Sequence, residues 1–448
     1  LRLEGTEELR TEATAGNTLR ISLDIVIQQY AQQLLERTIE QKNAKRGAIL
    51  MMNPENGEIY CMAIAPDFDL NDPFTIQNPE LQAQWDSMEE TEKTQALNQM
   101  WRNFCVNDTY EPGSTFKIIT AAAALSEDVV RLDETFQCSG SLVVADRRIR
   151  CHKAGGHGTE TFVQGVQNSC NPVFMTLALR LGADRFYEYL KAFRFDQKTG
   201  IDISGEAVGI MYNVGDVGPV ELATMGFGQS IAITPMQLLR AAASAVNGGN
   251  LITPHFGTEI LDSEGKALKT LEFPVEKGVL TPEVSRTLRE VLETVVSEGG
   301  GSKAAITGYR IGGKTATSQK LPRSAKKYIS SFLCFTPVEN AQIMTLMLID
   351  EPEGIYYGGT GCAPVVKELL ENVLPYLGIQ PEYTEEELQQ KDVSMSEVPD
   401  LLGMSLAQAK RAAGMELEVL GEGEQVIEQF PVSGEWINTD SKIVVYLG

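Results

Sequence analysis

The strand-like runs of this chain fall into two groups that a long helical stretch separates. Two runs come early and three come late, and they cover residues 47–52, 58–64, 309–318, 328–336 and 342–350. Between the groups, from about 114 to 300, apolar residues recur mostly at helical spacing. We therefore expect one antiparallel sheet assembled from sequence-distant parts, with a helical lobe inserted between them: an α+β fold.

Two helices should accompany this sheet. The first is predicted over 24–42, where apolar residues follow Ser22 and Asp24 as possible caps, and the second over 363–376. Residues 65–108 are polar and carry three prolines, so we expect them to be irregular.

The composition limits the class of protein. A chain of 448 residues with 43% apolar residues should form two or three folded units. The net charge of −23 argues against a nucleic-acid partner, because phosphate binding needs a Lys/Arg-rich surface. No apolar stretch is long enough to span a membrane, and the chain begins at Leu1, which suggests that a leader or anchor has been removed.

A second, smaller unit is expected at the C-terminus. Residues 379–397 are acidic and weakly apolar, which indicates a linker. From Val398 onward the pattern predicts a helix over 405–413 and three strands, over 415–420, 425–430 and 442–447.

The segment Pro112-Gly113-Ser114-Thr115-Phe116-Lys117 is the first with chemical potential. Residues three apart on a helix share a face, so the Lys117 amine can reach the Ser114 hydroxyl. A lysine with a lowered pKa can take the proton of a serine and make it a nucleophile. The alternative is an ordinary capped amphipathic helix.

Two further segments have similar potential. In Ser169-Cys170-Asn171, Ser169 could relay a proton and Asn171 could bind an amide, although a helix cap explains the same residues. In the predicted strand with Lys314, Thr315, Ala316 and Thr317, small and hydroxylated residues with a positive charge suit a carboxylate. The alternative there is a polar edge strand with a solvated lysine.

The order of these segments makes coincidence improbable. Ser-x-x-Lys, then Ser-x-Asn, then Lys-Thr-x is the arrangement of the penicillin-binding and β-lactamase serine acyltransferases. Residues 18–375 resemble the transpeptidase domain of class B penicillin-binding proteins, and 398–447 resemble a PASTA domain. A single C-terminal PASTA unit is most similar to the sporulation type of this family.

The resemblance implies a fold, and a domain plan with it. We expect a five-stranded antiparallel sheet with helices on both faces and an inserted helical lobe, followed by a small α+β PASTA domain. Residues 1–17 would be a remnant of an N-terminal pedestal, 18–378 the transpeptidase domain, 379–397 the linker and 398–448 the PASTA domain.

The resemblance also implies roles. Ser114 would attack the penultimate D-Ala carbonyl of a peptidoglycan stem peptide, with Lys117 as base, Ser169 as proton shuttle and Lys314 as electrostatic support. The substrate would be bound by Asn171, Thr315, Ala316 and Thr317, and β-lactams would acylate Ser114.

The expected surroundings follow from the same family. The protein would work at the cell membrane, on its extracytoplasmic face, with a glycan polymerase of the SEDS kind as partner. No cofactor and no metal are expected.

One position departs from the family pattern. The third motif normally ends in glycine, whereas this chain has Ala316. The extra methyl group lies where close backbone approach favours glycine. Ala316 leaves an inactive or sensor-type scaffold open as an alternative to the transpeptidase. A hydrolase of the carboxypeptidase or β-lactamase kind, which would pass the same acyl-enzyme to water, also stays open.

Cysteines lie near the second motif. Cys138 and Cys151 flank a predicted hairpin, and Cys170 lies inside the motif, so a Cys151–Cys170 or Cys138–Cys151 bridge competes with buried free thiols. His152 and His157 are close to Cys151, but zinc would need a further ligand that the sequence does not single out.

Overall fold

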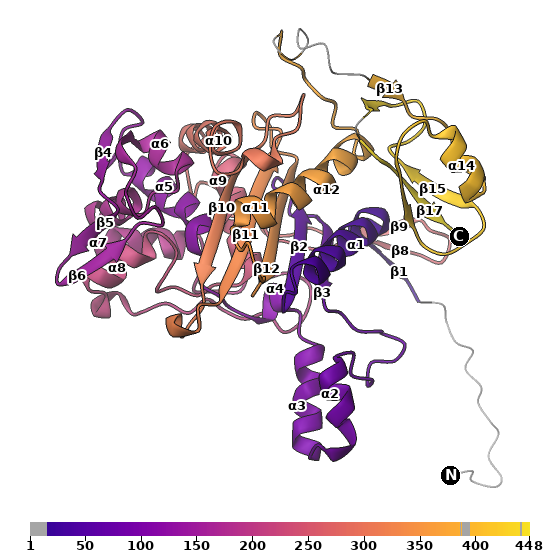
Figure 1. Cartoon of the computed structure of the whole chain (residues 1–448), viewed down its shortest axis with the longest axis horizontal. Helices are drawn as coiled ribbons and strands as arrows, with labels where there is room; N and C mark the ends of the chain where they lie inside the picture. Colours follow the sequence, from indigo (N-terminus) through magenta and orange to yellow (C-terminus); the bar gives the residue numbers. More distant parts are fainter. Residues whose placement is uncertain (1–15, 386, 388–394, 440) are drawn as a thin grey trace.

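A five-stranded antiparallel sheet forms the centre of the molecule in the computed structural model, which describes residues 16–385, 387, 395–439 and 441–448 (Figure 1). Its strand order is β10-β11-β12-β2-β3. The strands are β2 (Arg46–Met52), β3 (Ile59–Ala65), β10 (Gly312–Gln319), β11 (Tyr328–Thr336) and β12 (Ile343–Asp350). The predicted sheet of two early and three late strands is thus confirmed.

The pairing of β12 with β2 joins the two groups of strands. Leu346 lies opposite Leu50, and the register continues from Met344 opposite Met52 to Asp350 opposite Arg46. Successive side chains of a strand point to opposite faces, and here both faces are apolar. Such a sheet must be covered on both sides.

Helices cover the two faces. On one face, Ile49 and Met347 pack with α1 (Ile25–Gln41) and α12 (Ala363–Tyr376) in one apolar core. On the other face, Leu50 and Leu346 belong to a core that contains the helices of the inserted lobe. Helices α1 and α12 match the predicted ranges 24–42 and 363–376, and Figure 1 shows them beside the sheet.

The inserted lobe is helical where it was expected to be. Its main helices are α5 (Lys117–Ser126), α6 (Phe162–Gln167), α7 (Asn171–Ala192), α8 (Pro219–Met225), α9 (Pro235–Val246) and α10 (Pro282–Ser297). Helix α7 breaks at Gly182, whose φ of 73° is outside the helical region. The break divides α7 into two helical segments.

Short strands interrupt the lobe, and the sequence predicted one pair of them, the hairpin between Cys138 and Cys151. Two-stranded pairs form between β4 (Thr135–Cys138) and β7 (Gly158–Thr161), and between β5 (Ser141–Val144) and β6 (Arg147–Arg150). A three-stranded sheet joins β1 (Thr18–Ile21) to β8 (Gly257–Leu261) and β9 (Ala267–Thr270). All four residues of β1 and of β9 are exposed, so these strands carry no apolar alternation to detect.

Residues 65–108 are not irregular throughout, which corrects the sequence prediction. They contain α2 (Pro79–Gln84), α3 (Glu90–Met100) and α4 (Phe104–Asn107), and α2 with α3 projects from the body of the molecule (Figure 1). No residue of α2 or α3 is buried, so their sequences need no apolar face. Capping stabilises them instead: Asn78 accepts from the Leu81 amide, and Glu89 with Glu92 forms a capping box.

The C-terminal unit contains the predicted helix, α14 (Leu406–Ala412), and a sheet in the order β14-β17-β15. These strands are β14 (Leu417–Leu420), β15 (Val426–Phe430) and β17 (Ile443–Leu447). A further pair joins β16 (Trp436–Asn438) to β13 (Met395–Glu397), which falls inside the range predicted as linker.

This unit packs against the first domain through an aromatic contact. The Phe430 ring lies 5.7 Å from the Tyr30 ring of α1 and 5.1 Å from the Tyr376 ring of α12. Phe430, Leu420 and Val444 share an apolar core with α1 and α12. The predicted remnant 1–17 lies outside the described residues apart from Gly16 and Asn17. None of the helices in the described ranges combines the length and apolar character that crossing a bilayer requires.

Candidate active site

Ser114 lies in a 3-10 turn, Gly113–Phe116, that leads directly into α5. The turn depends on two glycines in the left-handed region, Gly113 with φ 58° and Gly228 with φ 82°. The Gly113 amide donates to the Gly228 carbonyl over 2.9 Å, and a Cβ on Gly228 would overlap the Gly113 backbone. The segment around Gly228 therefore supports the serine turn from behind.

Lys117, the first residue of α5, is buried beneath this turn. Its Nζ donates to the Ser169 carbonyl over 2.7 Å, to Asn171 Oδ1 over 2.8 Å and to Ser169 Oγ over 3.1 Å. Burial lowers the pKa of Lys117 to about 7, although Cys170, Cys151 and Glu160 oppose the shift. A large fraction of the amine is thus neutral near neutral pH, as a general base must be.

The second motif is held in a strained turn before α7. Ser169 has a φ of 52°, unusual for a residue with a side chain. Cys170 follows as the N-cap of α7, and Asn171 is its first residue. Asn171 also donates from Nδ2 to the Arg150 carbonyl over 3.2 Å. The helix-cap alternative is therefore wrong for these two residues: Cys170 is the N-cap, it makes no capping hydrogen bond through its side chain, and Ser169 and Asn171 contact Lys117 instead.

The third motif occupies β10, the edge strand of the sheet. Lys314 is completely buried, which rules out the solvated lysine of the alternative hypothesis. Burial and the nearby Lys117 lower the Lys314 pKa well below its usual value, since two ammonium groups cannot easily share a buried site. Thr315 and Thr317 are half-buried and face away from Lys314, as strand alternation requires.

A cleft of about 580 Å³ brings the three motifs together. Six of the predicted site residues line it, namely Ser114, Ser169, Asn171, Thr315, Ala316 and Thr317. Lys117 and Lys314 are buried and do not line it, but Lys117 donates to Ser169 and Asn171, and Lys314 directly precedes Thr315. All eight predicted site residues thus belong to one groove and the residues buried beside it.

The pairing of Ser114 with Lys117 differs from the expected one. Among the hydrogen bonds of the described residues, none joins the Ser114 hydroxyl to the Lys117 amine. All three donors of a charged Lys117 are directed to the Ser-x-Asn motif. Loss of one proton would free a lone pair for an incoming proton.

The sequence analysis missed a further segment of the cleft wall. Tyr357, Gly358, Gly359 and Thr360 line the cleft, and the last three belong to the short helix α11 (Gly358–Gly361) that follows β12. The Gly358 amide donates to Thr317 Oγ1 over 3.2 Å, and a Cβ on Gly358 would overlap the Ser331 and Ala316 carbonyls. The Gly-Gly-Thr-Gly run at 358–361 was the available signal for a close backbone approach.

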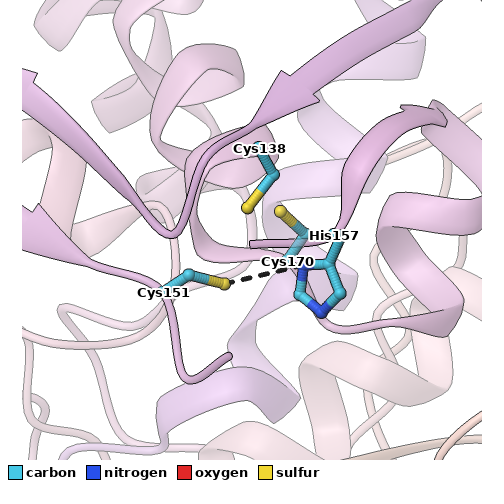
Figure 2. Close-up of side chains that lie close together, drawn as sticks. All are labelled: Cys138, Cys151, His157 and Cys170. Atoms are coloured by element: carbon cyan, nitrogen blue, oxygen red, sulfur yellow. Dashed lines mark hydrogen bonds between the residues drawn. The ribbon is translucent and has the colours of Figure 1, made fainter. Parts of the chain in front are cut away.

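All seven cysteines are free and buried. Neither candidate bridge is formed, in agreement with the free-thiol alternative. The structure does gather Cys138, Cys151, His157 and Cys170 into one cluster beside the second motif (Figure 2).

A second cavity, of about 160 Å³, lies between α12 and the C-terminal unit and is lined in part by Trp436, Tyr309 and Tyr383. Trp436 is 59% exposed. None of the predicted site residues lines this cavity.

Two family models match the chain. The penicillin binding protein transpeptidase domain covers residues 47–371, and the PASTA domain covers 396–448.

The curated relatives include a sporulation protein and a penicillin-binding protein. The chain is similar to stage V sporulation protein D of Bacillus subtilis, with 39% identity over 95% of this chain and 65% of that protein. Penicillin-binding protein PbpB of Mycolicibacterium smegmatis is 27% identical over 82% of this chain and 56% of its own length. The chain thus spans somewhat less than two thirds of these relatives.

Solved structures share the fold. A putative peptidoglycan glycosyltransferase from Atopobium parvulum superposes with a TM-score of 0.71 and 26% identity, over 83% of this chain and 82% of that chain. Penicillin binding protein 3 from Mycobacterium tuberculosis, complexed with aztreonam, superposes with a TM-score of 0.71 and 22% identity, over 84% of this chain and 82% of that chain. The chain therefore belongs to the class B penicillin-binding protein family, with a transpeptidase domain followed by a PASTA domain.

Proposed function

We propose that this protein is a peptidoglycan D,D-transpeptidase that works through a Ser114 acyl-enzyme. The observation that carries the proposal is the single cleft lined by Ser114, Ser169 and Thr317, with the buried amines of Lys117 and Lys314 beside it. We assign the activity to residues 18–378, ahead of the acidic linker 379–397 and the PASTA domain 398–448.

In the acylation step, neutral Lys117 accepts the Ser114 proton while Oγ bonds to the penultimate D-Ala carbonyl carbon. The C–N bond to the terminal D-Ala then breaks, and its amine receives a proton through Ser169, whose Oγ lies 3.1 Å from Lys117 Nζ. The backbone amides of Ser114 and Thr317 would stabilise the oxyanion.

Substrate binding falls to the residues around the serine. Thr317 Oγ1 already accepts a hydrogen bond from Gly358, so its own proton is free to donate to the substrate carboxylate, with Thr315 beside it. Asn171 keeps one Nδ2 proton for a substrate amide, since the other is directed to Arg150.

In the second step, the amine of another stem peptide attacks the acyl-enzyme, and Ser114 leaves with a proton. The new amide is the cross-link. β-Lactams would acylate Ser114 in the same way. Because the leaving amine stays attached through the opened ring, it would remain in the cleft and block the amine of the second stem peptide.

The setting of the reaction is part of the proposal. A transpeptidase needs glycan strands that another protein polymerises, so we infer a membrane-embedded SEDS-type partner. The site would face the extracytoplasmic side of the cell membrane, where the stem peptides are.

An intact mass spectrum after benzylpenicillin treatment tests the proposal, with the Ser114→Ala variant as control. We expect one long-lived adduct in the wild-type protein and none in the variant. Rapid loss of the adduct would support a hydrolase, and no adduct would support an inactive scaffold. Transfer of a stem-peptide acyl group to an added amine then separates a transpeptidase from a sensor.

A further inference from the structure

Four side chains from four different segments meet beside the second motif. Cys138 ends β4, Cys151 follows β6, His157 precedes β7 and Cys170 caps α7. One ligand atom from each lies within 4.8 Å of the other three. In Figure 2 the three sulfur atoms and the imidazole are directed toward a common centre.

The spacing of these atoms is close to that of a tetrahedral metal site. Bonds of about 2.3 Å to sulfur and about 2.0 Å to nitrogen place neighbouring ligand atoms about 3.5–3.8 Å apart around zinc. Cys151 Sγ and His157 Nδ1 are 3.8 Å apart. The other ligand atoms, which lie within 4.8 Å of one another, would need to move only slightly closer to complete a tetrahedral site.

The cluster is buried and lies beside a buried carboxylate. Cys138, Cys151 and Cys170 are each at most 5% exposed, and the His157 side chain is 5% exposed. Glu160, which is 3% exposed, places Oε1 3.7 Å from His157 Nδ1, and this oxygen has no hydrogen-bond partner. A buried carboxylate oxygen without a partner is costly, and a divalent cation at the cluster would offset that cost.

We propose that Cys138, Cys151, His157 and Cys170 form a structural zinc site. Three thiols would lose their protons on binding, and the imidazole would bind in its neutral form. Three sulfur donors and one nitrogen in a closed four-coordinate set favour zinc over hard cations such as Mg²⁺ or Ca²⁺. A disulfide would use two of the four donors and leave the others without partners.

The sequence analysis rejected zinc because it considered Cys151, His152 and His157 alone. His152 is exposed and does not belong to the cluster. The missing ligands come from β4 and α7, which only the tertiary fold brings close.

The position of the site gives it a positioning role. Cys170 lies between Ser169 and Asn171, which both accept hydrogen bonds from Lys117. Zinc would fix this turn to the strands β4 and β7, at the edge of the cleft that His157 also lines. Zinc binding at the cluster does not depend on the proposed function, whereas an effect of zinc on Ser114 acylation rests on the proposed function.

Metal content of the full chain tests occupancy directly. The protein is loaded with Zn²⁺, dialysed against metal-free buffer and measured by mass spectrometry for elements. We expect about one zinc per chain in the wild type, and loss of it in Cys138→Ser and His157→Asn. Cys105→Ser, a buried cysteine outside the cluster, and His152→Asn are matched controls that should keep zinc.

Two further measurements use the wild-type protein, so they test the proposal even if a ligand variant does not fold. Cobalt in place of zinc should give thiolate-to-metal charge-transfer absorption in the wild-type protein. Cys138, Cys151 and Cys170 should resist alkylation until a chelator is added. Zinc-free wild-type protein with alkylated thiols, or a Cys151–Cys170 bridge in zinc-loaded protein, would overturn the proposal.

Removal of zinc should slow benzylpenicillin acylation of Ser114 by about tenfold, as loss of a positioning shell commonly does. If zinc is bound but Ser114 is never acylated, the proposed function fails and the metal site stands. If acylation proceeds and zinc is absent, the reverse holds.

Discussion

At the scale of single residues, the two lysines distinguish this site from an ordinary polar cleft. Lys117 has three acceptors within 3.1 Å and is completely buried, so its charge is only partly compensated. Its lowered pKa follows mainly from desolvation.

This gives a pH prediction. Below a pH of about 7 the Lys117 amine is mostly protonated and cannot accept the Ser114 proton, and above it the amine is mostly neutral. The acylation rate with benzylpenicillin should therefore rise tenfold per pH unit on the acid side and level off above neutrality. Rapid-quench measurements across the neutral range check this. Lys117→Arg, which cannot lose its proton, should react about 10²–10⁴-fold more slowly at every pH.

Ala316 provides a second prediction at this scale. The Ala316 side chain is 4% exposed in the cleft wall, on the same strand face as Lys314. Ala316→Gly should acylate about three- to tenfold faster, equivalent to about 1 kcal/mol of barrier. It should also unfold at a lower temperature, because glycine costs about 0.5–1 kcal/mol within a strand. Equal acylation rates would show that the methyl group does not impede the ligand.

Residue identities in the site could be predicted from sequence, while their environments could not. Ser114, Ser169 and Lys314 stand in an order that is itself informative. That Lys314 is buried and that Lys117 contacts Ser169 depend on how β10 and α7 pack, and no local pattern encodes that packing. The cysteine cluster was missed for the same reason.

At the scale of elements, the detectable ones have apolar periodicity. The sheet strands and α1 could be predicted because their buried positions are apolar residues at regular spacing in the sequence. Helix α3 and strands β1 and β9 have no buried residues, so their sequences show no apolar periodicity.

The serine turn gives an element-scale prediction. Gly228→Ala places a Cβ against the Gly113 backbone at a φ of 82°. The φ alone costs about 1–2 kcal/mol, and the overlap adds to it, so thermal unfolding should shift down and Ser114 labelling should slow. Gly215→Ala, at a position with open space and ordinary φ, is the control. Unchanged labelling in Gly228→Ala would mean that the turn does not depend on this contact.

At the scale of the whole molecule, the PASTA domain packs on the side of the sheet opposite the lobe. Besides Phe430, an ion-pair network joins the two domains: Lys442 contacts Glu368 of α12 over 3.0 Å and Glu418 of β14 over 2.9 Å. Arg37 of α1 contacts the same Glu368 over 2.6 Å.

We predict that Phe430→Ala loosens this interface. Removing a buried phenylalanine costs about 3–5 kcal/mol, much of it here from the contacts with Tyr30 and Tyr376. Hydrogen exchange should increase in α1, α12 and β15, while Ser114 labelling stays near the wild-type rate. Ile427→Ala, at a 57% exposed position of the same strand, should change neither. Faster exchange confined to β15 would contradict a shared interface.

The pairing of β12 with β2 also determines how much of the chain must be synthesised before the cleft can form. Strand β2 begins at Arg46, but its partner ends at Asp350, and β10, which carries the third motif, reaches the sheet only through β11 and β12. Synthesis must therefore deliver some three hundred residues before the cleft has both walls. Until then, Ser114 and Lys117 belong to a groove that lacks the wall formed by β10.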